Sequence, residues 1–193
     1  MSDTSYCYQN TNVLKNKLNI HDFEKLQEAE RKITMLRISD LIDVPIEGNF
    51  DLKHFKEIHK YIFQDIYDWA GEIRTVDIAK GNMFCKVQFI HIQAEEIFKK
   101  INLQSLESIN YDEFISKIAY YFSEINALHP FREGNGRTQR EFIRELALKC
   151  GYKIDFSKIS KEQMLEASKD SFLCKYDKME LLFNTCLSRC DFK

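Results

Sequence analysis

One short segment of the chain, His129 to Arg140, concentrates the residue types that could act on a phosphate group. It reads His-Pro-Phe-Arg-Glu-Gly-Asn-Gly-Arg-Thr-Gln-Arg. Pro130 disfavours continuation of a preceding helix, so we expect the His129 side chain at a helix end, projecting into a loop. An imidazole with an unperturbed pKa of ~6.5 can take a proton from a hydroxyl nucleophile at neutral pH. His129 is therefore the candidate general base.

The glycines of this segment predict an anion-binding loop. Gly134 and Gly136 permit backbone conformations that direct successive N–H groups at one point. The loop opens onto the start of a predicted helix, where free N–H groups and the positive end of the helix dipole favour phosphate. Arg137 and Arg140 lie three residues apart on the first turns of that helix, so they share a face and can bind a polyphosphate together.

Glu133 is the one acid in this basic segment, and a carboxylate beside a phosphate site commonly holds Mg²⁺. A base, a metal-binding acid, an anion site and two arginines suit phosphoryl or nucleotidyl transfer, where positioning and charge stabilisation do most of the catalysis. Each feature alone is usually a helix stop, a turn or a solvated face. Their occurrence within twelve residues favours a phosphate site, and the chain has neither a Walker A nor a Rossmann fingerprint.

The elements that must position this segment are mostly helical. The chain has 193 residues, about one domain, with 44% hydrophobic residues and only 6 Gly and 2 Pro. The formal charge of −2 excludes a protein held to nucleic acid by its net charge, so no direct nucleic-acid partner is expected. No stretch of ~20 apolar residues is present, which predicts neither a membrane span nor a signal peptide, and hence a cytoplasmic protein.

Hydrophobic periodicity predicts one mainly helical (all-α) domain over residues 1–193 with one short β-hairpin. The first twenty residues are polar and predict coil or short turns. The hairpin strands are expected at 73–79 and 84–89, with the turn at Lys80, Gly81 and Asn82. Helices are expected at 22–42, 51–71, 93–101, 111–128, 136–150, 161–168 and 176–187.

The six cysteines predict buried free thiols rather than a disulfide framework, because none are spaced as CxxC and the chain is long for a disulfide-stapled fold. Cys186 and Cys190 lie four residues apart. On a helix they would share a face, which leaves a metal-binding role open.

The segment 129–140 resembles, without a mismatch, the HPFx(D/E)GNGRxxR signature of Fic-domain proteins. The resemblance extends to Tyr67-Asp-Trp-Ala-Gly-Glu-Ile-Arg74 before the hairpin and to Glu124-Ile-Asn-Ala-Leu128 before His129, and it covers about residues 10–190. It implies a helical Fic fold and transfer of AMP from ATP to a Ser, Thr or Tyr hydroxyl of a target protein, with release of pyrophosphate.

The resemblance also implies a role for each residue of the loop. His129 would be the base, Phe131 would anchor the loop, and Glu133 would bind the Mg²⁺ that bridges the α- and β-phosphates. The hairpin turn would be the flap that covers the nucleotide and registers the target by strand addition. The remaining positions would bind the nucleotide: Gly134, Asn135 and Gly136 as an anion hole, Arg137 on the phosphates, Arg140 on the γ-phosphate, and Lys80, Gly81 and Asn82 in the flap.

Two features of the chain bear on the reaction and its control. Doc-type relatives, which phosphorylate their targets, carry Lys where this chain has Gly136, so AMP transfer is favoured. The self-inhibitory pattern (S/T)xxxE(G/N) is missing, because Asp43 and His129 precede the two Glu-Gly pairs by four residues. The resemblance therefore implies a toxin held by a small antitoxin protein whose Glu reaches Arg140. For that class it implies a bacterial type II topoisomerase as target, either DNA gyrase (through its B subunit) or topoisomerase IV.

Other functions remain open on the residues alone. A Fic-fold phosphotransferase could use another donor, such as a different nucleotide or a phosphocholine carrier, or act as a kinase. A non-catalytic nucleotide-binding module is disfavoured, because His129, Glu133 and Arg140 are all present. A metal-dependent nuclease lacks second and third metal ligands near His129, and the net charge of −2 offers DNA no attraction.

Overall fold

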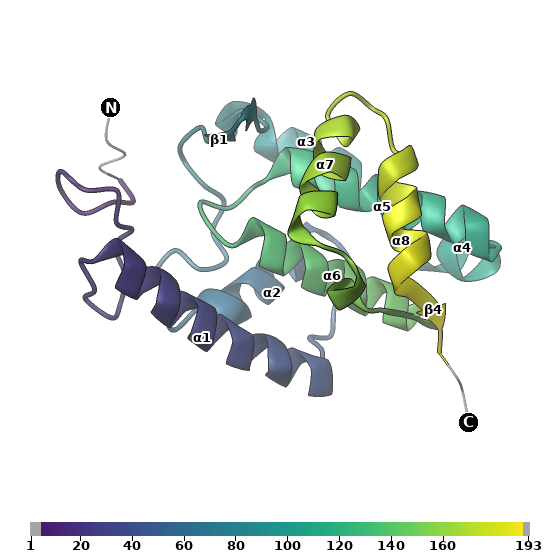
Figure 1. Ribbon diagram of the computed structural model, residues 1–193, viewed down its shortest axis with the longest axis horizontal. Coiled ribbons are helices and arrows are strands. Elements are labelled where there is room, and N and C mark those ends of the chain that lie inside the picture. The colour runs from purple at the N-terminus through teal and green to yellow at the C-terminus, as the bar shows by residue number, and fades with distance from the viewer. Residues whose placement is uncertain (1–4, 191–193) are drawn as a thin grey trace.

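The computed structural model describes residues 5–190 as a helical body with two small sheets (Figure 1). This confirms the mainly helical fold with one short hairpin. Among residues 5–190, no helix is long and apolar enough to cross a bilayer. The helices are Phe23–Asp43 (α1), Leu52–Phe63 (α2), Ile90–Phe98 (α3), Leu103–Ser108 (α4), Tyr111–Leu128 (α5), Asn135–Lys149 (α6), Lys161–Ser171 (α7) and Asp177–Cys186 (α8). Antiparallel sheets pair Ala79–Lys80 (β1) with Asn82–Met83 (β2) and Tyr152–Ile154 (β3) with Leu187–Arg189 (β4), and 3₁₀ turns span Val87–Phe89 (η1) and Phe156–Lys158 (η2).

Polar side chains set the starts of the long helices by accepting hydrogen bonds from otherwise unpaired backbone N–H groups. Asp22, the first residue of the helix predicted at 22–42, caps α1, and Asp51 caps α2. Asn110 begins α5 with a capping box, in which the Glu113 side chain accepts the Asn110 N–H in return. The α5 helix then runs unbroken to its C-cap at His129. Its length therefore delivers the candidate base to a fixed place.

Aromatic rings fill the core between α2, α3 and α6. Phe55 of α2 and Phe142 of α6 have no exposed surface, and their rings meet edge to face with centroids 5.2 Å apart. Phe98 of α3 packs on both rings, at 5.4 and 5.6 Å. Burying each such side chain stabilises the fold by about 2 kcal/mol. These contacts hold α6 at the centre of the body (Figure 1), so its N-terminal turn is a rigid platform.

The second helix is shorter than the sequence predicts. It ends at Phe63, whereas the apolar pattern suggested an end near Gly71. After it, the rings of Tyr67 and Trp69 stack with centroids 4.2 Å apart and an angle of 16° between their planes. Gly71 then adopts φ 84°, and its N–H donates to Nδ1 of His59 at 2.8 Å. Aromatic packing and this hydrogen bond therefore replace the predicted last helical turns.

The hairpin is also shorter than predicted. Its strands have two residues each, with Gly81 at φ 80° in the turn, whereas strands at 73–79 and 84–89 were expected. The end of the second predicted strand is the 3₁₀ turn η1, which leads into α3 three residues earlier than Gln93, the expected start. In the β-branched stretch before the hairpin, Arg74 Nη1 donates to Val76 O and the Thr75 N–H donates to the Tyr6 hydroxyl, so side-chain hydrogen bonds stand in place of the predicted strand ladder there.

Two elements and one cysteine pair differ from expectation. The sequence indicated neither the short helix α4 nor the sheet formed by β3 and β4, whose three-residue strands pair across more than thirty residues of chain. All six cysteines are free thiols, as predicted, but only Cys7 and Cys186 are buried, and Cys174 is exposed. Cys186 ends α8 while Cys190 follows β4, so the two do not share a helix face.

Candidate active site

The segment 129–134 connects α5 to α6, and both of its ends have left-handed backbone. His129 is the C-cap of α5 with φ 44° and ψ 60°, and its N–H donates to Ile125 O at 3.1 Å. Gly134 precedes α6 with φ 80° and ψ 0°. A positive φ is uncommon for a residue other than glycine, and here it turns the chain out of α5. The His129 side chain consequently leaves the helix and lines a cavity.

Three contacts hold His129. Its Nδ1 lies 3.2 Å from Asn126 O, and because a carbonyl only accepts, Nδ1 carries the proton and Nε2 keeps a lone pair. The Phe84 ring stacks on the imidazole with centroids 3.7 Å apart and planes 10° apart. The backbone His129 O accepts a hydrogen bond from Arg74 Nε at 2.9 Å. Burial lowers the pKa of His129 to about 4, so the imidazole is neutral near pH 7, as a general base must be.

Phe131 anchors the loop from inside. It has no exposed surface and stacks on His59, with centroids 3.8 Å apart, and on Phe55, at 5.3 Å. Asn135 closes the turn around it: Phe131 N–H donates to Asn135 Oδ1 at 2.8 Å, and Asn135 Nδ2 donates to Phe131 O at 2.7 Å. Since His59 Nδ1 already accepts an N–H, its Nε2 donates to Glu133 O at 3.0 Å. Burial lowers the pKa of His59 to about 3, which keeps it neutral in this role.

The N-terminal turn of α6 offers free backbone donors beside Gly134. The carbonyl of Gly134 accepts the N–H groups of Arg137 and Thr138, both at 3.1 Å. Within residues 5–190, no group accepts a hydrogen bond from the N–H of Asn135 or Gly136. Free N–H groups at the positive end of a 15-residue helix favour an anion, as the sequence predicts.

Arg140 is a largely buried cation beside the loop. It lines the same cavity as His129, and in the described part of the chain no acidic side chain pairs with it. Burial, with the charge of nearby Arg137, lowers the pKa of Arg140. A desolvated guanidinium without a counter-charge costs free energy that a bound anion would recover. Arg140 and the free N–H groups are therefore the candidate anion-binding groups of this site.

Arg137, by contrast, is engaged by α1. Its Nη1 donates to Thr34 Oγ1 at 3.0 Å, its Nη2 forms an ion pair with Glu30, and its guanidinium lies 4.8 Å from the centre of the Phe63 ring. The second oxygen of Glu30 accepts a hydrogen bond from the Tyr67 hydroxyl. The guanidinium is thus tied to α1, and Arg137 is not among the side chains that line the cavity. Sequence analysis did not find Glu30 or Thr34, since a polar residue on a long helix carries no signal of its partner.

Glu133 fits a magnesium ion held largely by phosphate. Its Oε1 accepts the Gly134 N–H at 2.9 Å and lies 3.8 Å from Nη2 of Arg137, and the side chain is 33% exposed. Over residues 5–190, no three His, Cys, Asp or Glu side chains are grouped to hold a metal ion. One carboxylate completed by phosphate oxygens and water is a usual arrangement for Mg²⁺. Glu133 would therefore be the protein ligand.

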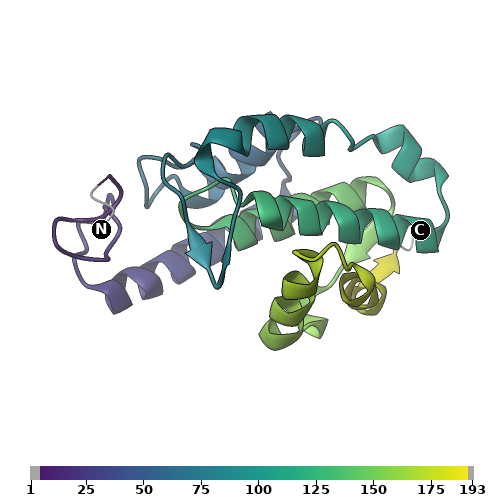
Figure 2. The same ribbon diagram turned by 90° about the horizontal axis from the view of Figure 1, so that it is seen from above.

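The hairpin forms one edge of the cavity. Lys80 of β1 and Gly81 of the turn line it, and Asn82 pairs with Lys80 in the strand register. Figure 2 shows the hairpin projecting past the end of α5 toward the side that carries α7. This is where a flap over a nucleotide would lie.

Arg74 joins the hairpin to the loop. Its side chain is fully buried and donates to Val76 O at 2.7 Å, to Cys85 O, and to His129 O. Its backbone N–H donates to Pro130 O at 2.9 Å. Sequence analysis quoted Arg74 in the resemblance but gave it no role. One guanidinium thus holds both flanks of the hairpin against the residue that carries the base.

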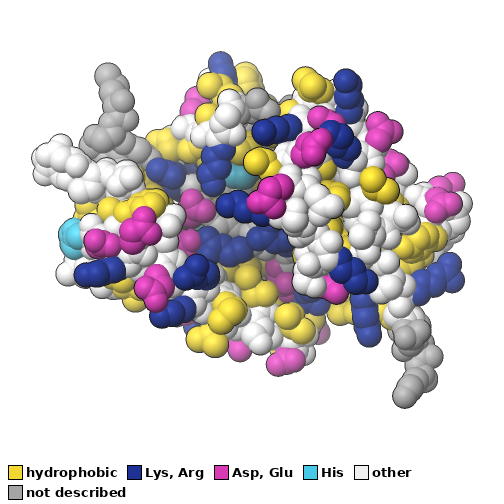
Figure 3. Space-filling view, in the orientation of Figure 1, with side chains coloured by type: hydrophobic (Ala, Val, Ile, Leu, Met, Phe, Trp, Pro, Cys, Tyr) yellow, Lys and Arg dark blue, Asp and Glu magenta, His cyan; other side chains and the backbone are white. Residues whose placement is uncertain are grey.

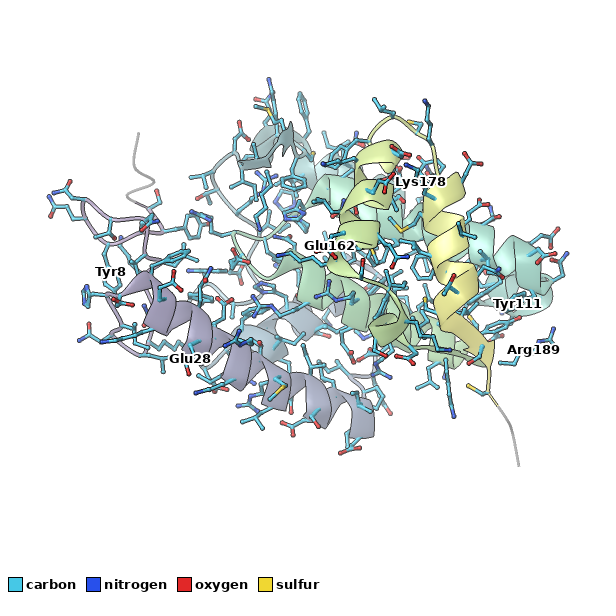
Figure 4. All side chains as sticks on the ribbon, in the orientation of Figure 1. Tyr8, Glu28, Tyr111, Glu162, Lys178 and Arg189 are labelled. Carbon is cyan, nitrogen blue, oxygen red and sulfur yellow. The ribbon has the colours of Figure 1, made fainter. Side chains whose placement is uncertain are left out.

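The cavity between the hairpin and α7 has a volume of about 770 Å³, within the usual range for small-molecule sites. Figure 3 shows Lys and Arg side chains gathered in the hollow between α1 and α7. The α7 side contributes Lys161, Ser168 and Phe172, none of which sequence analysis singled out. Lys178 of α8, labelled in Figure 4, fixes that wall. It pairs with Asp170 at 3.0 Å and with Glu166, both on α7.

Comparisons with known proteins identify the family. A family model described as Fic/DOC matches residues 49–147, slightly more than half of the chain.

The chain belongs to the Fic/DOC family.

Two relatives carry names that state an activity. The protein adenylyltransferase VbhT of Bartonella schoenbuchensis is 40% identical over 97% of this chain, which spans 40% of the length of VbhT. The probable protein adenylyltransferase y4lH of Sinorhizobium fredii is 37% identical over 86% of both chains. Both relatives are thus named protein adenylyltransferases, the second as a probable one.

A solved structure of this family has the same fold. BepC of Bartonella tribocorum, crystallised with bound AMPPNP, is 26% identical, with a TM-score of 0.90 over 96% of this chain and 97% of that one. Of the loop positions quoted from the Fic signature, the structure brings His129 and Arg140 to one cavity and buries Phe131 beneath it. Arg137 lies on the α1 side of the same helix.

We expect Gly134→Ala to destabilise the Fic loop far more than Gly81→Ala. Both glycines have φ 80°, which costs an L-residue about 1–2 kcal/mol. A Cβ at Gly134 would overlap the Phe63 ring, whereas a Cβ at Gly81 meets nothing within 4 Å. Overpacking adds ~1–3 kcal/mol, so urea unfolding should give a total loss of ~2–5 kcal/mol for Gly134→Ala. Equal losses for the two variants would contradict the packing of Gly134.

Proposed function

We propose that this chain transfers AMP from ATP to a hydroxyl side chain of a target protein. The observation that carries the proposal is the neutral imidazole of His129, whose Nδ1 is fixed on Asn126 O. It lines one cavity with Arg140, which no acidic side chain of residues 5–190 pairs with. The names of the adenylyltransferase relatives and the AMPPNP bound to BepC support ATP as the donor.

The residues divide the reaction between them. Nε2 of His129 accepts the proton of the target hydroxyl as its oxygen attacks the α-phosphorus. The bond from that phosphorus to the bridging oxygen breaks, and pyrophosphate leaves with the electron pair. The free N–H groups of Asn135 and Gly136 and the guanidinium of Arg140 bind the phosphate oxygens, where negative charge must be stabilised.

Three further groups complete the proposed site. Glu133 would hold Mg²⁺, which supplies charge neutralisation between the α- and β-phosphates when bound. Arg137 approaches the phosphates from the α1 side, with its guanidinium braced by Glu30. Lys80, Gly81 and Asn82 form the flap over the nucleotide, and an unpaired edge of this two-stranded hairpin can receive the target backbone as an added strand.

We further propose that the chain is a cytoplasmic toxin restrained by a small antitoxin protein. The free thiols suit a reducing compartment in which ATP is present. Within residues 5–190 Arg140 has no carboxylate partner, so an inhibitor that supplies a Glu from outside would block the γ-phosphate site. A type II topoisomerase, either DNA gyrase or topoisomerase IV, is the proposed target class, on the Fic resemblance.

Labelled ATP separates AMP transfer from phosphorylation. With Mg²⁺ and bacterial lysate, label on the α-phosphate should enter a protein band and label on the γ-phosphate should not. His129→Ala should lose at least about 100-fold of this transfer, because the base is gone. His91→Ala, which changes an exposed histidine of α3, should keep it. If label enters the protein only from the γ-phosphate, the chain is a kinase. If label from the α-phosphate still enters the protein with His129→Ala, His129 is not the general base. The labelled band, once identified, tests the topoisomerase target.

The pH profile of kcat/KM for AMP transfer should have its acidic limb well below the ordinary histidine range. Burial holds the folded-state pKa of His129 at about 4, so the neutral base persists as the pH falls from 6.5 toward 4 and is lost only below that. Burial also opposes protonation of His59, so the free energy of unfolding decreases as the pH falls from 6.5 toward 3. Circular dichroism must therefore show that the protein is folded at each pH of the profile. A limb at ~6.5 in the folded protein would contradict the burial of the base.

Expression in bacteria tests the toxin proposal. The chain alone should arrest growth, whereas His129→Ala should be tolerated, because the harm depends on transfer. Co-expression of the antitoxin should restore growth, and Arg140→Ala should reduce the toxicity. A purified chain that is fully active and yet harmless in cells would contradict a toxin role while leaving the transfer activity standing.

A further inference from the structure

Phe84 lies flat against the imidazole of His129. The two ring centroids are 3.7 Å apart and the planes differ by 10°, so the phenyl ring covers one face of the imidazole at van der Waals distance. Phe84 is 8% exposed and also lines the cavity. It follows β2 in the chain and lies 45 residues before the base, so it reaches His129 only through the tertiary fold.

The backbone on both sides of Phe84 is pinned. Its own N–H donates to Ile78 O across the hairpin at 3.3 Å, and the next N–H, of Cys85, donates to Ala127 O at the end of α5 at 3.0 Å. Cys85 O accepts a hydrogen bond from Arg74, which also binds His129 O. The phenyl ring is therefore attached to the same frame as the imidazole that it covers.

Phe84 also packs on α7. Its ring lies 5.8 Å from that of Phe172, with an angle of 50° between the planes. Phe172 follows the last residue of α7, and that helix is tied to α8 through the ion pairs of Lys178. The phenyl ring thus lies between the base and a braced helix, which limits how far it can move away.

The stack restricts the one motion that the other contacts leave to the imidazole. The hydrogen bond from Nδ1 to Asn126 O fixes the ring at a single point, and at 3.2 Å it is at the long end of the range. A ring held at one point can still tilt about it, and a tilt moves Nε2 away from the attacking hydroxyl. A flat contact over a whole face removes that freedom. Misplacement of a reacting group by about 1 Å can cost about 100-fold in rate.

We propose that Phe84 is a positioning residue for the transfer reaction, which fixes the plane of the His129 imidazole and so directs the lone pair of Nε2 at the target hydroxyl. The proposal rests on the proposed function for its effect on rate. The stack itself is independent of that function.

The stack can be detected through the pKa of His129. Burial is the largest cause of the lowered pKa of His129, and the phenyl ring supplies part of that burial. Lys80 of the hairpin and Arg74 lower it further, whereas Glu133 of the loop and the hydrogen bond to Asn126 O raise it. Removing the phenyl ring leaves these groups in place and admits water to one face, so the pKa should move up toward 6.5.

The experiment compares Phe84→Leu, Phe84→Tyr and Phe89→Leu in the full chain. Phe89 is a half-exposed aromatic residue of the same segment, with no ring contact among the described residues, so it is the matched control. The pKa of His129 is measured by NMR, from the chemical shifts of its ring protons against pH without nucleotide, and the His129→Ala spectrum assigns those protons. In a second experiment, kcat and KM for AMP transfer are measured at a fixed pH. Phe84→Leu should raise the His129 pKa and lower kcat about 10- to 100-fold, while Phe84→Tyr and Phe89→Leu stay near wild type.

Each other outcome overturns the proposal. If Phe84→Leu leaves both the pKa and kcat unchanged, the stack does not position the base. If kcat falls without a change in pKa, or the fall is not rescued by Phe84→Tyr, the residue is only structural. Should Phe84→Leu not fold, the wild-type spectrum decides, because the His129 ring protons must carry the upfield ring-current shift of a phenyl stack. If the wild-type protein shows no AMP transfer, the proposed function is wrong. The NMR titration of His129 then still tests whether Phe84 stacks on the imidazole.

Discussion

The buried guanidinium of Arg74 is the interaction on which the rest of the site depends. It donates to carbonyls on both flanks of the hairpin and to the carbonyl of His129, so it sets the distance between the hairpin and the loop. A charged group is costly to bury unless its donors are satisfied. Here the three carbonyls accept hydrogen bonds from the guanidinium, and the carboxylate of Asp77, 3.8 Å from Nη1, provides an opposite charge. Because the alternative is an unpaired buried cation, the hairpin and the loop are held together cooperatively.

Beneath this junction, the site is built on neutral aromatic groups and opens onto charged ones. Phe131, stacked on His59 and Phe55, gives the loop a rigid floor that needs no counter-charge. Above that floor lie Arg140 and the first N–H groups of α6, which are positive and find no partner among the described residues. Such preorganised donors in a partly water-excluded cavity are what stabilises charge on a phosphate. The His129 imidazole stays neutral beside them because burial, Lys80 and Arg74 all lower its pKa.

The local features of the fold were predictable because their signals are local. The period of the apolar residues located the long helices, the Asp22 cap marked the start of α1, and the start of α5 at Tyr111 followed from its pattern. The predictions were wrong where aromatic stacking ended α2 early, and where side-chain hydrogen bonds replaced most of the hairpin ladder. The short helix α4 and the sheet of β3 and β4 gave no signal, since a three-residue strand has no periodicity to detect.

The sequence by itself determined the loop, because its glycines, its proline and its asparagine act over a few residues, and the Fic resemblance rests on the same twelve positions. Only the tertiary structure decided what surrounds it. The pairing of Arg137 with Glu30 spans 107 residues, the stack of Phe84 on His129 joins the hairpin to α5, and α7 supplies a cavity wall from beyond the motif. The physical reason is that a side chain's partner at long separation is set by how helices pack, and no local pattern of residue types encodes that packing.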